Sequence, residues 1–166
     1  MDGEPQVVTL REVTDDDLPI FFEQERDPDA NYMAAFTAKD PSDKVAFAAH
    51  WARIRADTTV TNRTILCNGV VAGSVASYVD GGKPEVTYWL GKQYWGKGIA
   101  TAALAALLSL VTVRPIYAHV AKDNIASLRV LQKCGFVITG ESTWFANARN
   151  AVVEEYVLEL RGIDGA

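Results

Sequence analysis

The stretch Trp95-Gly96-Lys97-Gly98-Ile99-Ala100-Thr101 lies where a series of strand-like segments gives way to an apolar, alanine-rich segment of helical character. Its glycines allow the backbone to approach a ligand closely, and the N–H groups of a first helical turn have no partner within the helix. A pyrophosphate group suits both these donors and the positive end of the helix dipole. The stretch therefore predicts an anion-binding loop, with a glycine turn that holds no ligand as the alternative.

Two other phosphate-binding loops fit this stretch less well. The P-loop needs four residues between its first glycine and a Gly-Lys-Ser/Thr, and the sequence contains no such string. The dinucleotide fingerprint requires a third glycine where Thr101 stands, and it opens a parallel sheet. Asp123 is suitably spaced for a ribose-binding acid, so the dinucleotide alternative stays open as a minor one.

The segments before the loop predict an antiparallel meander. Strand-like residues run over 60–67, 70–79 and 84–90, and an Asn-Gly pair and a Gly-Gly pair separate them as turns. Further upstream we expect a strand over 7–11 and then a helix that begins at Thr14 with three aspartates in its first turn.

An irregular segment and a second helix complete the first third of the chain. Prolines interrupt residues 23–44, which we expect to be irregular, and helical spacing resumes over 42–55. From the loop onward we expect helices over 97–111 and 125–133. We expect strands over 116–121, between these helices, and over 136–145 and 152–160, after them. A meander followed by a strand–helix–strand unit predicts an α+β fold with a mixed sheet.

A second segment, residues 124–136, reads Asn-Ile-Ala-Ser-Leu-Arg-Val-Leu-Gln-Lys-Cys-Gly-Phe and begins where the next predicted strand ends. Together the two segments resemble the GCN5-related N-acetyltransferase (GNAT) family, in which the first binds the pyrophosphate of acetyl-CoA and the second packs beside the pantetheine and thioester. The resemblance extends from about Val7 to Leu160. It is closest to the branch of the ribosomal-protein N-terminal (alanine/serine) acetyltransferases, in which Tyr-Trp-Leu, Trp-Gly-Lys-Gly and Asn-x-x-Ser are typical.

The resemblance implies a GNAT-like fold and acetyl-CoA as the cosubstrate. The fold would be a single domain over residues 1–166, with a strongly twisted mixed sheet of about seven strands flanked by about four helices. Backbone groups at the end of the strand before the loop would serve the pantetheine arm, the loop would hold the pyrophosphate, and Asn124 would bond the pantetheine unless it is only a helix cap. The implied cosubstrate-binding residues are Trp89, Leu90, Trp95, Gly96, Lys97, Gly98, Ile99, Ala100, Thr101, Asn124 and Ser127.

The sequence matches the family's catalytic residues less fully than its cosubstrate-binding residues. The family's frequent general acid, a tyrosine, corresponds here to Leu131, which cannot protonate a leaving group. A CoA thiolate leaves without much help, because thiols titrate near about 8.5. Glu85, near the start of the strand that leads to the loop, is the best candidate for the general base. The alternative is that Glu85 is a surface charge paired across strands.

The implied reaction is direct attack of a primary amine on the thioester, with no covalent enzyme intermediate. A protein N-terminal amine is one candidate acceptor; a polyamine or an aminoglycoside is the alternative, and a module that binds acyl-CoA without transfer is the alternative outside the enzymes. Three aromatic residues flank the family's acceptor cleft, although core packing is the competing role for each: Tyr32, Trp51 and Trp144. We expect no metal site, since His50 and His119 form no spaced cluster with carboxylates.

Composition narrows the classes of partner. With 49% hydrophobic and 22% charged residues the chain is typical of a folded globular protein, and a net charge of −5 disfavours nucleic acid and anionic membranes as partners. No secretory signal or membrane span is recognisable, so we expect a cytoplasmic protein. Cys67 and Cys134 are expected to be core residues. The oligomeric state stays open, with a homodimer among the alternatives.

Overall fold

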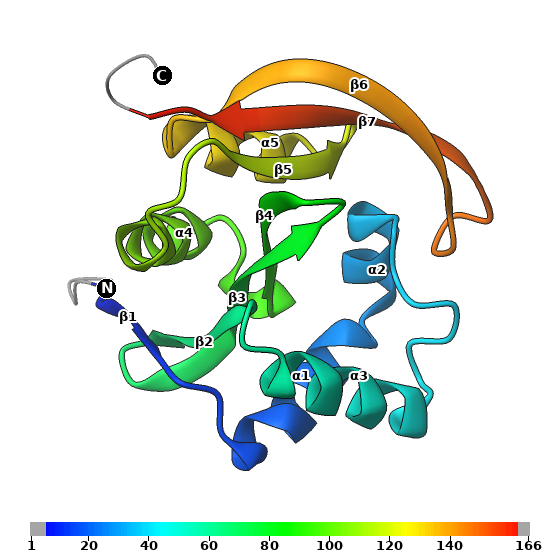
Figure 1. The fold of residues 1–166 in the computed structure, drawn as a ribbon. Helices are drawn as coiled ribbons and strands as arrows, with labels where there is room; N and C mark the ends of the chain where they lie inside the picture. The colour runs from blue at the N-terminus through cyan, green and yellow to red at the C-terminus, as the bar shows by residue number, and fades with distance from the viewer. Residues whose placement is uncertain (1–5, 163–166) are drawn as a thin grey trace.

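The computed structural model describes residues 6–162 and consists of one seven-stranded sheet with helices on both faces (Figure 1). The strand order is β1-β2-β3-β4-β5-β7-β6, and every neighbouring pair is antiparallel except β4 and β5, which run parallel. The strands are β1 (Val8–Arg11), β2 (Thr61–Cys67), β3 (Val70–Asp80), β4 (Lys83–Leu90), β5 (Ile116–Ala121), β6 (Val137–Ala146) and β7 (Ala151–Leu160). The predicted mixed α+β fold is therefore confirmed.

Five α-helices occur in the described residues, where about four were expected. They are α1 (Leu18–Glu25), α2 (Pro28–Ala34), α3 (Lys44–Ala56), α4 (Ile99–Leu110) and α5 (Ile125–Lys133). The additional helix is α2, and the expectation of an irregular segment there was wrong. Pro28 is the first residue of α2, a position where its missing N–H costs nothing, and the Asp27 carboxylate accepts a hydrogen bond from Asp29 N at 2.8 Å as the N-cap.

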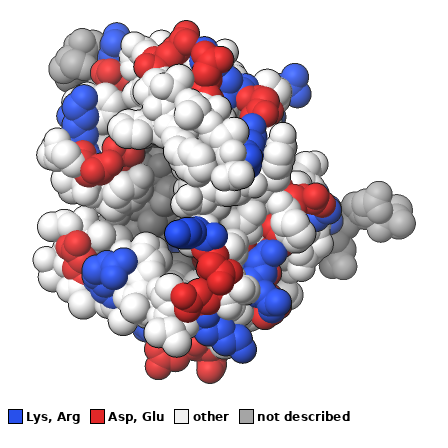
Figure 2. Space-filling view, turned by 90° about the vertical axis from the view of Figure 1, so that its right-hand side faces the viewer, with Lys and Arg blue, Asp and Glu red and all other residues white. Residues whose placement is uncertain are grey.

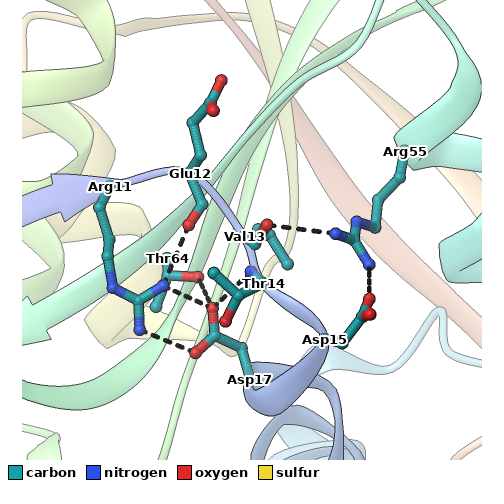
Figure 3. A network of polar contacts seen from close by, with 8 residues as sticks. All are labelled: Arg11, Glu12, Val13, Thr14, Asp15, Asp17, Arg55 and Thr64. Carbon is teal, nitrogen blue, oxygen red and sulfur yellow. Dashed lines mark hydrogen bonds and ion pairs between the residues drawn. The ribbon is translucent and has the colours of Figure 1, made fainter.

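The aspartate run forms a short 3-10 turn, Asp15–Asp17, instead of the first turn of an α-helix. Asp17 is only 2% exposed, and Arg11 binds its two carboxylate oxygens at 2.7 and 2.8 Å (Figure 3). Thr14 N and the Thr64 hydroxyl also donate to it, at 2.9 and 2.7 Å. Asp17 thereby joins β1, the start of α1 and β2.

Strand alternation divides the helices between the two faces of the sheet. Val86 and Leu90 of β4 belong to the main core together with the buried side of α4. Trp89, which lies between them in sequence and projects to the other face, donates its indole N–H to the Gln24 carbonyl of α1 at 3.2 Å. The sheet thus has α4 on one face and α1 on the other.

The parallel pair β4 and β5 is joined at a single registered position, Glu85 with Tyr117. By contrast, β3 and β4 pair at eight positions, from Gly73–Leu90 to Asp80–Lys83. Within the described residues no later pair links β4 to β5, so the strands part as they run toward their carboxyl ends. This opening in the sheet leads to the glycine loop after β4 and to Asn124 after β5.

The two cysteines differ in burial. Cys67 is buried as expected, whereas Cys134 is only half-buried. Across residues 6–162, no helix is long and apolar enough to cross a membrane.

Candidate active site

A cavity of about 1320 Å³ is lined by β4 and β5, the start of α4, α5, the segment from α1 to α3 and the end of the β6–β7 hairpin. The molecule is hollowed on the side where α2 and that hairpin project, with charged side chains around the opening (Figure 2). The volume exceeds the roughly 300–1,000 Å³ of a typical small-molecule pocket. It is therefore large enough for an extended cosubstrate and an acceptor together.

The glycine loop borders this cavity and is shaped for close backbone approach. Gly96 and Gly98 have φ angles of 73° and 79°, and a Cβ atom built on either would meet no heavy atom within 4 Å. Gly98 is the N-cap of α4, so the helix begins at Ile99 and not at Lys97 as predicted. The cavity lining includes five of the six predicted loop residues: Gly96, Gly98, Ile99, Ala100 and Thr101. Lys97 is exposed and lies outside the lining.

The residues that precede the loop also border the cavity. Trp89, Leu90 and Trp95 belong to its lining. The Trp95 indole N–H donates to the Leu90 carbonyl at 2.9 Å. That carbonyl therefore already accepts one hydrogen bond, which leaves one lone pair for a ligand.

Asn124 and Ser127 reach the cavity from α5, as predicted for the second segment. Asn124 Oδ1 accepts a hydrogen bond from Ser127 N at 3.3 Å, which makes Asn124 the N-cap of α5. Its Nδ2 also donates to the Met33 carbonyl of α2 at 3.2 Å. The Tyr88 hydroxyl donates to Ser127 Oγ at 3.0 Å. Leu131 is a core residue that is 3% exposed.

Glu85 lies at the position where β4 and β5 part, and its side chain borders the cavity. It is only 6% exposed, so the alternative of a surface charge is excluded. The Tyr78 hydroxyl donates to Glu85 Oε1 at 3.1 Å, and burial, followed by the Glu85 charge, raises the pKa of Tyr78. His119 Nε2 lies 3.4 Å from the same carboxylate oxygen.

His119 and Glu155 complete a cluster that sequence reasoning missed. His119 Nδ1 lies 2.8 Å from Glu155 Oε2, a contact that the spacing of these residues in the sequence did not indicate. Hydrogen bonds with Glu155 and then Glu85 raise the pKa of His119 to about 10. The signal in the sequence was weak, because the three residues are far apart and meet only through the pairing of β5 with β4 and β7.

The Glu155 carboxylate is 3% exposed and well supplied with donors. In addition to His119, the Ser142 hydroxyl and the Trp144 indole N–H donate to Glu155 Oε2, the latter at 3.0 Å. Burial alone would raise the pKa of Glu155, but the hydrogen bonds from His119 and Ser142 outweigh it and lower the pKa. A cluster of two carboxyl groups and an imidazole with a raised pKa therefore lies beside the cavity.

The three predicted acceptor residues have different positions. Trp144 borders the cavity at its rim and holds Glu155. Tyr32 lies outside the lining, where the Arg149 guanidinium covers its ring at 4.2 Å from the centroid. Trp51 is a core residue, 4% exposed and stacked on Phe21 at 5.1 Å, and it does not border the cavity. The structure therefore gives only Trp144 a direct place in this cavity.

A further carboxylate, Glu25 at the end of α1, borders the cavity near α3 and was not predicted. Burial raises the pKa of Glu25 to about 7. Glu25 forms no ion pair with the residues that the structure describes. Over the same residues, no three His, Cys, Asp or Glu side chains are grouped so as to hold a metal ion.

A mixed sheet whose parallel pair parts beside a glycine loop at a helix N-terminus defines a class of α+β protein suited to an extended, phosphate-bearing cosubstrate. A family model described as an acetyltransferase (GNAT) domain matches residues 8–137. The chain therefore belongs to the GNAT acetyltransferase family, as its two segments predicted. Acetyl-CoA is the cosubstrate of this family.

Individual relatives are distant. An uncharacterized N-acetyltransferase p20 from Bacillus licheniformis is 27% identical over 85 residues, which are 49% of this chain and 48% of that protein. The chain thus matches about half the length of this curated relative.

Solved structures show the same fold over almost the whole chain. RimJ from Mycobacterium smegmatis, in complex with CoA-disulfide, has a TM-score of 0.79 at 22% identity over 95% of this chain and 83% of its own. A phosphinothricin acetyltransferase from Sinorhizobium meliloti has a TM-score of 0.79 at 19% identity, with 96% and 90% covered. A spermidine N-acetyltransferase from Vibrio cholerae has a TM-score of 0.74 at 19% identity, with 92% and 95% covered.

Proposed function

We propose that this chain is an acetyl-CoA-dependent N-acetyltransferase that transfers the acetyl group to a primary amine by direct attack. One observation carries the proposal: a single cavity is bordered both by the glycine loop at the start of α4 and by the buried Glu85 carboxylate, where β4 and β5 part. The first can bind phosphates, and the second can accept a proton from an amine.

The cosubstrate would bind with its pyrophosphate at the N–H groups from Gly96 to Thr101. The positive φ angles of both glycines aim the backbone at this position, and the open space around them leaves room for phosphate oxygens. The pantetheine arm would follow the opening between β4 and β5 past Leu90 and Asn124. Its thioester would then lie near Glu85, Ser127 and the parting of the strands.

The chemistry needs one base and a good leaving group. Glu85 would take a proton from the acceptor ammonium, directly or through a water, so that the amine lone pair attacks the thioester carbon. The C–N bond forms, the nitrogen loses its second proton to solvent, the C–S bond breaks, and CoA leaves as a thiolate that takes a proton from solvent. Thiols titrate near about 8.5, so a dedicated acid is dispensable where Leu131 stands.

For the acceptor, we propose a protein N-terminal amine first and a small amine such as a polyamine or aminoglycoside as the alternative. The sequence motifs and the fold of RimJ favour the first. The second is favoured by the equally extensive likeness to enzymes that are named for small amine substrates. The large cavity volume accommodates either class.

The experiment is a CoA-release assay with acetyl-CoA and a panel of peptides that differ in their N-terminal residue, beside spermidine and other small amines. Turnover with peptides alone would support a protein acceptor, and turnover with small amines alone would overturn it. If the protein binds acetyl-CoA but releases CoA with no amine, it is a binding module, and the proposed enzyme function is wrong.

Gly98→Asp tests the cosubstrate site separately. A carboxylate about 4 Å from one phosphate charge costs about 4 kcal/mol at an effective dielectric constant of about 20, so acetyl-CoA affinity should fall steeply. Gly69→Asp is the matched control, because Gly69 also has a positive φ of 82° and open surroundings but lies in the turn between β2 and β3. Unchanged acetyl-CoA affinity in folded Gly98→Asp protein would show that the loop does not bind the cosubstrate.

A further inference from the structure

The cluster of Glu85, His119 and Glu155 contains more titratable groups than the proposed reaction uses. Glu85 is the proposed base, but Glu155 is equally buried and lies on β7, on the same side of the sheet. Two carboxylates that share one low-dielectric site repel each other, and such a pair tends to hold a proton between them. His119 lies between these two, with its ring nitrogens 3.4 Å from Glu85 and 2.8 Å from Glu155.

The contacts around Glu155 indicate that it serves His119 and not the acceptor. Glu155 Oε2 accepts hydrogen bonds from His119 Nδ1, the Ser142 hydroxyl and the Trp144 indole N–H. Three donors from β5 and β6 therefore converge on one carboxylate oxygen and fix its position. Because Nδ1 of His119 is bound there, Nε2 is the ring nitrogen left to face Glu85.

We propose that His119 is a positioning residue for the acetyl transfer: Glu155 fixes its ring, and the ring holds the Glu85 carboxylate where β4 and β5 part. This inference rests on the proposed role of Glu85 as the base. The Tyr78 hydroxyl supports the same Glu85 oxygen from β3, so the carboxylate is held from both neighbouring strands. Charge reinforces the geometry, because an imidazolium between two carboxylates removes most of the repulsion between them.

The titratable groups that act on His119 come from the strands packed beside β5. They are Glu85 on β4 and Glu155 on β7, and both raise the pKa of His119. Tyr78 on β3 acts through Glu85 as a neutral donor. His119 is thus a cation at neutral pH, in contrast with His50, whose pKa is lowered by burial and by Arg53.

The first test follows the ionisation of the histidines and not the reaction, so it needs no acceptor. The chain contains only two histidines, so their imidazole signals can be told apart. A titration of the imidazole signals by NMR should show His119 still protonated at pH 8 and His50 neutral. In Glu155→Gln protein, His119 should titrate at lower pH. Glu154→Gln is the matched control, since the neighbouring Glu154 is exposed and pairs with Lys122 at 3.2 Å. If His119 titrates near its ordinary pH in the unmodified protein, the inference is wrong.

The second test uses the rate. His119→Gln removes the cation, and we expect a roughly tenfold lower kcat, an acidic limb of the kcat/KM profile that moves to higher pH, and an unchanged KM for acetyl-CoA. His119→Lys keeps a cation and should restore the pH profile in part, which a purely structural role of the ring would not allow. An unchanged profile in His119→Gln would overturn the inference.

Failure of the inference can be told apart from failure of the proposed function by adding Glu85→Gln. If Glu85→Gln loses activity and His119→Gln does not, Glu85 is the base and His119 does not position it. If Glu85→Gln retains full activity, the proposed base is wrong and the positioning role is overturned with it.

Discussion

The buried and half-buried carboxylates of this protein differ in whether a cation lies beside them. Glu85 and Glu155 share His119, and Asp17 is bound by Arg11 through two hydrogen bonds. Glu25 borders the same cavity as Glu85 but has no such partner in the described part of the chain. A carboxyl group that is partly removed from water and has no cation beside it favours its neutral form, whereas a carboxyl group beside a cation favours its charged form. The two kinds of carboxyl group therefore change the free energy of unfolding in opposite directions as the pH rises.

At the residue scale, we expect Glu85 to be the group that accepts the proton of the acceptor amine. Glu85→Gln keeps the size of the side chain and removes its basicity, so kcat should fall by roughly 10² while acetyl-CoA affinity stays the same. The measurement is a pH–rate profile: loss of a base removes or shifts the acidic limb, whereas loss of mere attraction raises the acceptor's KM. Glu141→Gln, an exposed carboxylate on β6, is the control. Full activity across pH would show that the amine loses its proton elsewhere.

At the scale of single elements, the first residues of α4 and α5 and the close contact between β3 and β4 shape the candidate cosubstrate site. Asn124 caps α5 and also bonds α2 through Met33, and Gly98 caps α4 with a left-handed backbone. Both caps border the cavity. The ends of two helices are therefore formed by residues that also define the cosubstrate site.

Asn124→Ala should reduce both stability and affinity. Loss of the cap should lower the free energy of unfolding by about 1 kcal/mol. Loss of one hydrogen bond to the pantetheine should weaken CoA binding by about 0.5–1.5 kcal/mol. A melting curve beside a calorimetric titration measures the two effects. Asp27→Ala, which removes the N-cap of α2 outside the cavity lining, should lower stability alone. Equal CoA affinity in Asn124→Ala protein would leave Asn124 with a capping role only.

Gly73→Ala tests the pairing of β3 with β4. A Cβ atom at Gly73 would lie 2.0 Å from the Trp89 carbonyl oxygen, which is backbone and cannot turn aside. Overpacking of this kind costs about 1–3 kcal/mol or more, and it should also displace the end of β4 from the cavity. Chemical denaturation measures the loss. Gly140→Ala on β6 is the control, because its Cβ would have only an ordinary contact of 3.8 Å with Val157.

At the scale of the whole molecule, the paired and unpaired groups set the pH at which the fold is most stable. Arg11 and the other donors hold the pKa of Asp17 far below its usual range, so stability is lost as the pH falls below about 4, where the unfolded chain takes up protons first. Glu25 acts in the opposite direction. Its pKa rises from 4.5 to about 7 on folding, so stability falls as the pH rises through that window.

His119 adds to the loss at high pH. Its pKa is raised from 6.5 to about 10, so its contribution is complete below the lower value and disappears as the pH approaches the upper one. The maximum of stability is therefore expected on the mildly acidic side of neutrality. Denaturant unfolding from pH 3 to pH 9 measures the curve.

The variant Glu25→Gln tests how much of the fall in stability toward high pH comes from Glu25. Without an ionisable group at this position, the protein should be more stable than the unmodified one at pH 8, by on the order of 2–3 kcal/mol, and the slope between pH 4.5 and 7 should shrink. The exposed Glu23→Gln on the same helix should leave the curve unchanged. If the slope persists in Glu25→Gln protein, another group is responsible for it.

The sequence by itself determined the order of the strands, four of the five α-helices within residues 6–162 and the glycine turn before α4. These features depend on local patterns: alternation, helical spacing, turn pairs, and glycines where the backbone has a positive φ. The local rules failed at α2, where Pro28 was interpreted as an interruption although it begins the helix.

Only the tertiary structure decided which polar side chains meet. The cluster of Glu85, His119 and Glu155 needs β5 to lie between β4 and β7, which is a property of strand order and register. Packing likewise placed Trp51 in the core and the half-buried Glu25 at the cavity. The physical reason is that a carboxylate's ionisation and reach depend on its neighbours in space, and strands pair with partners that are distant in the chain.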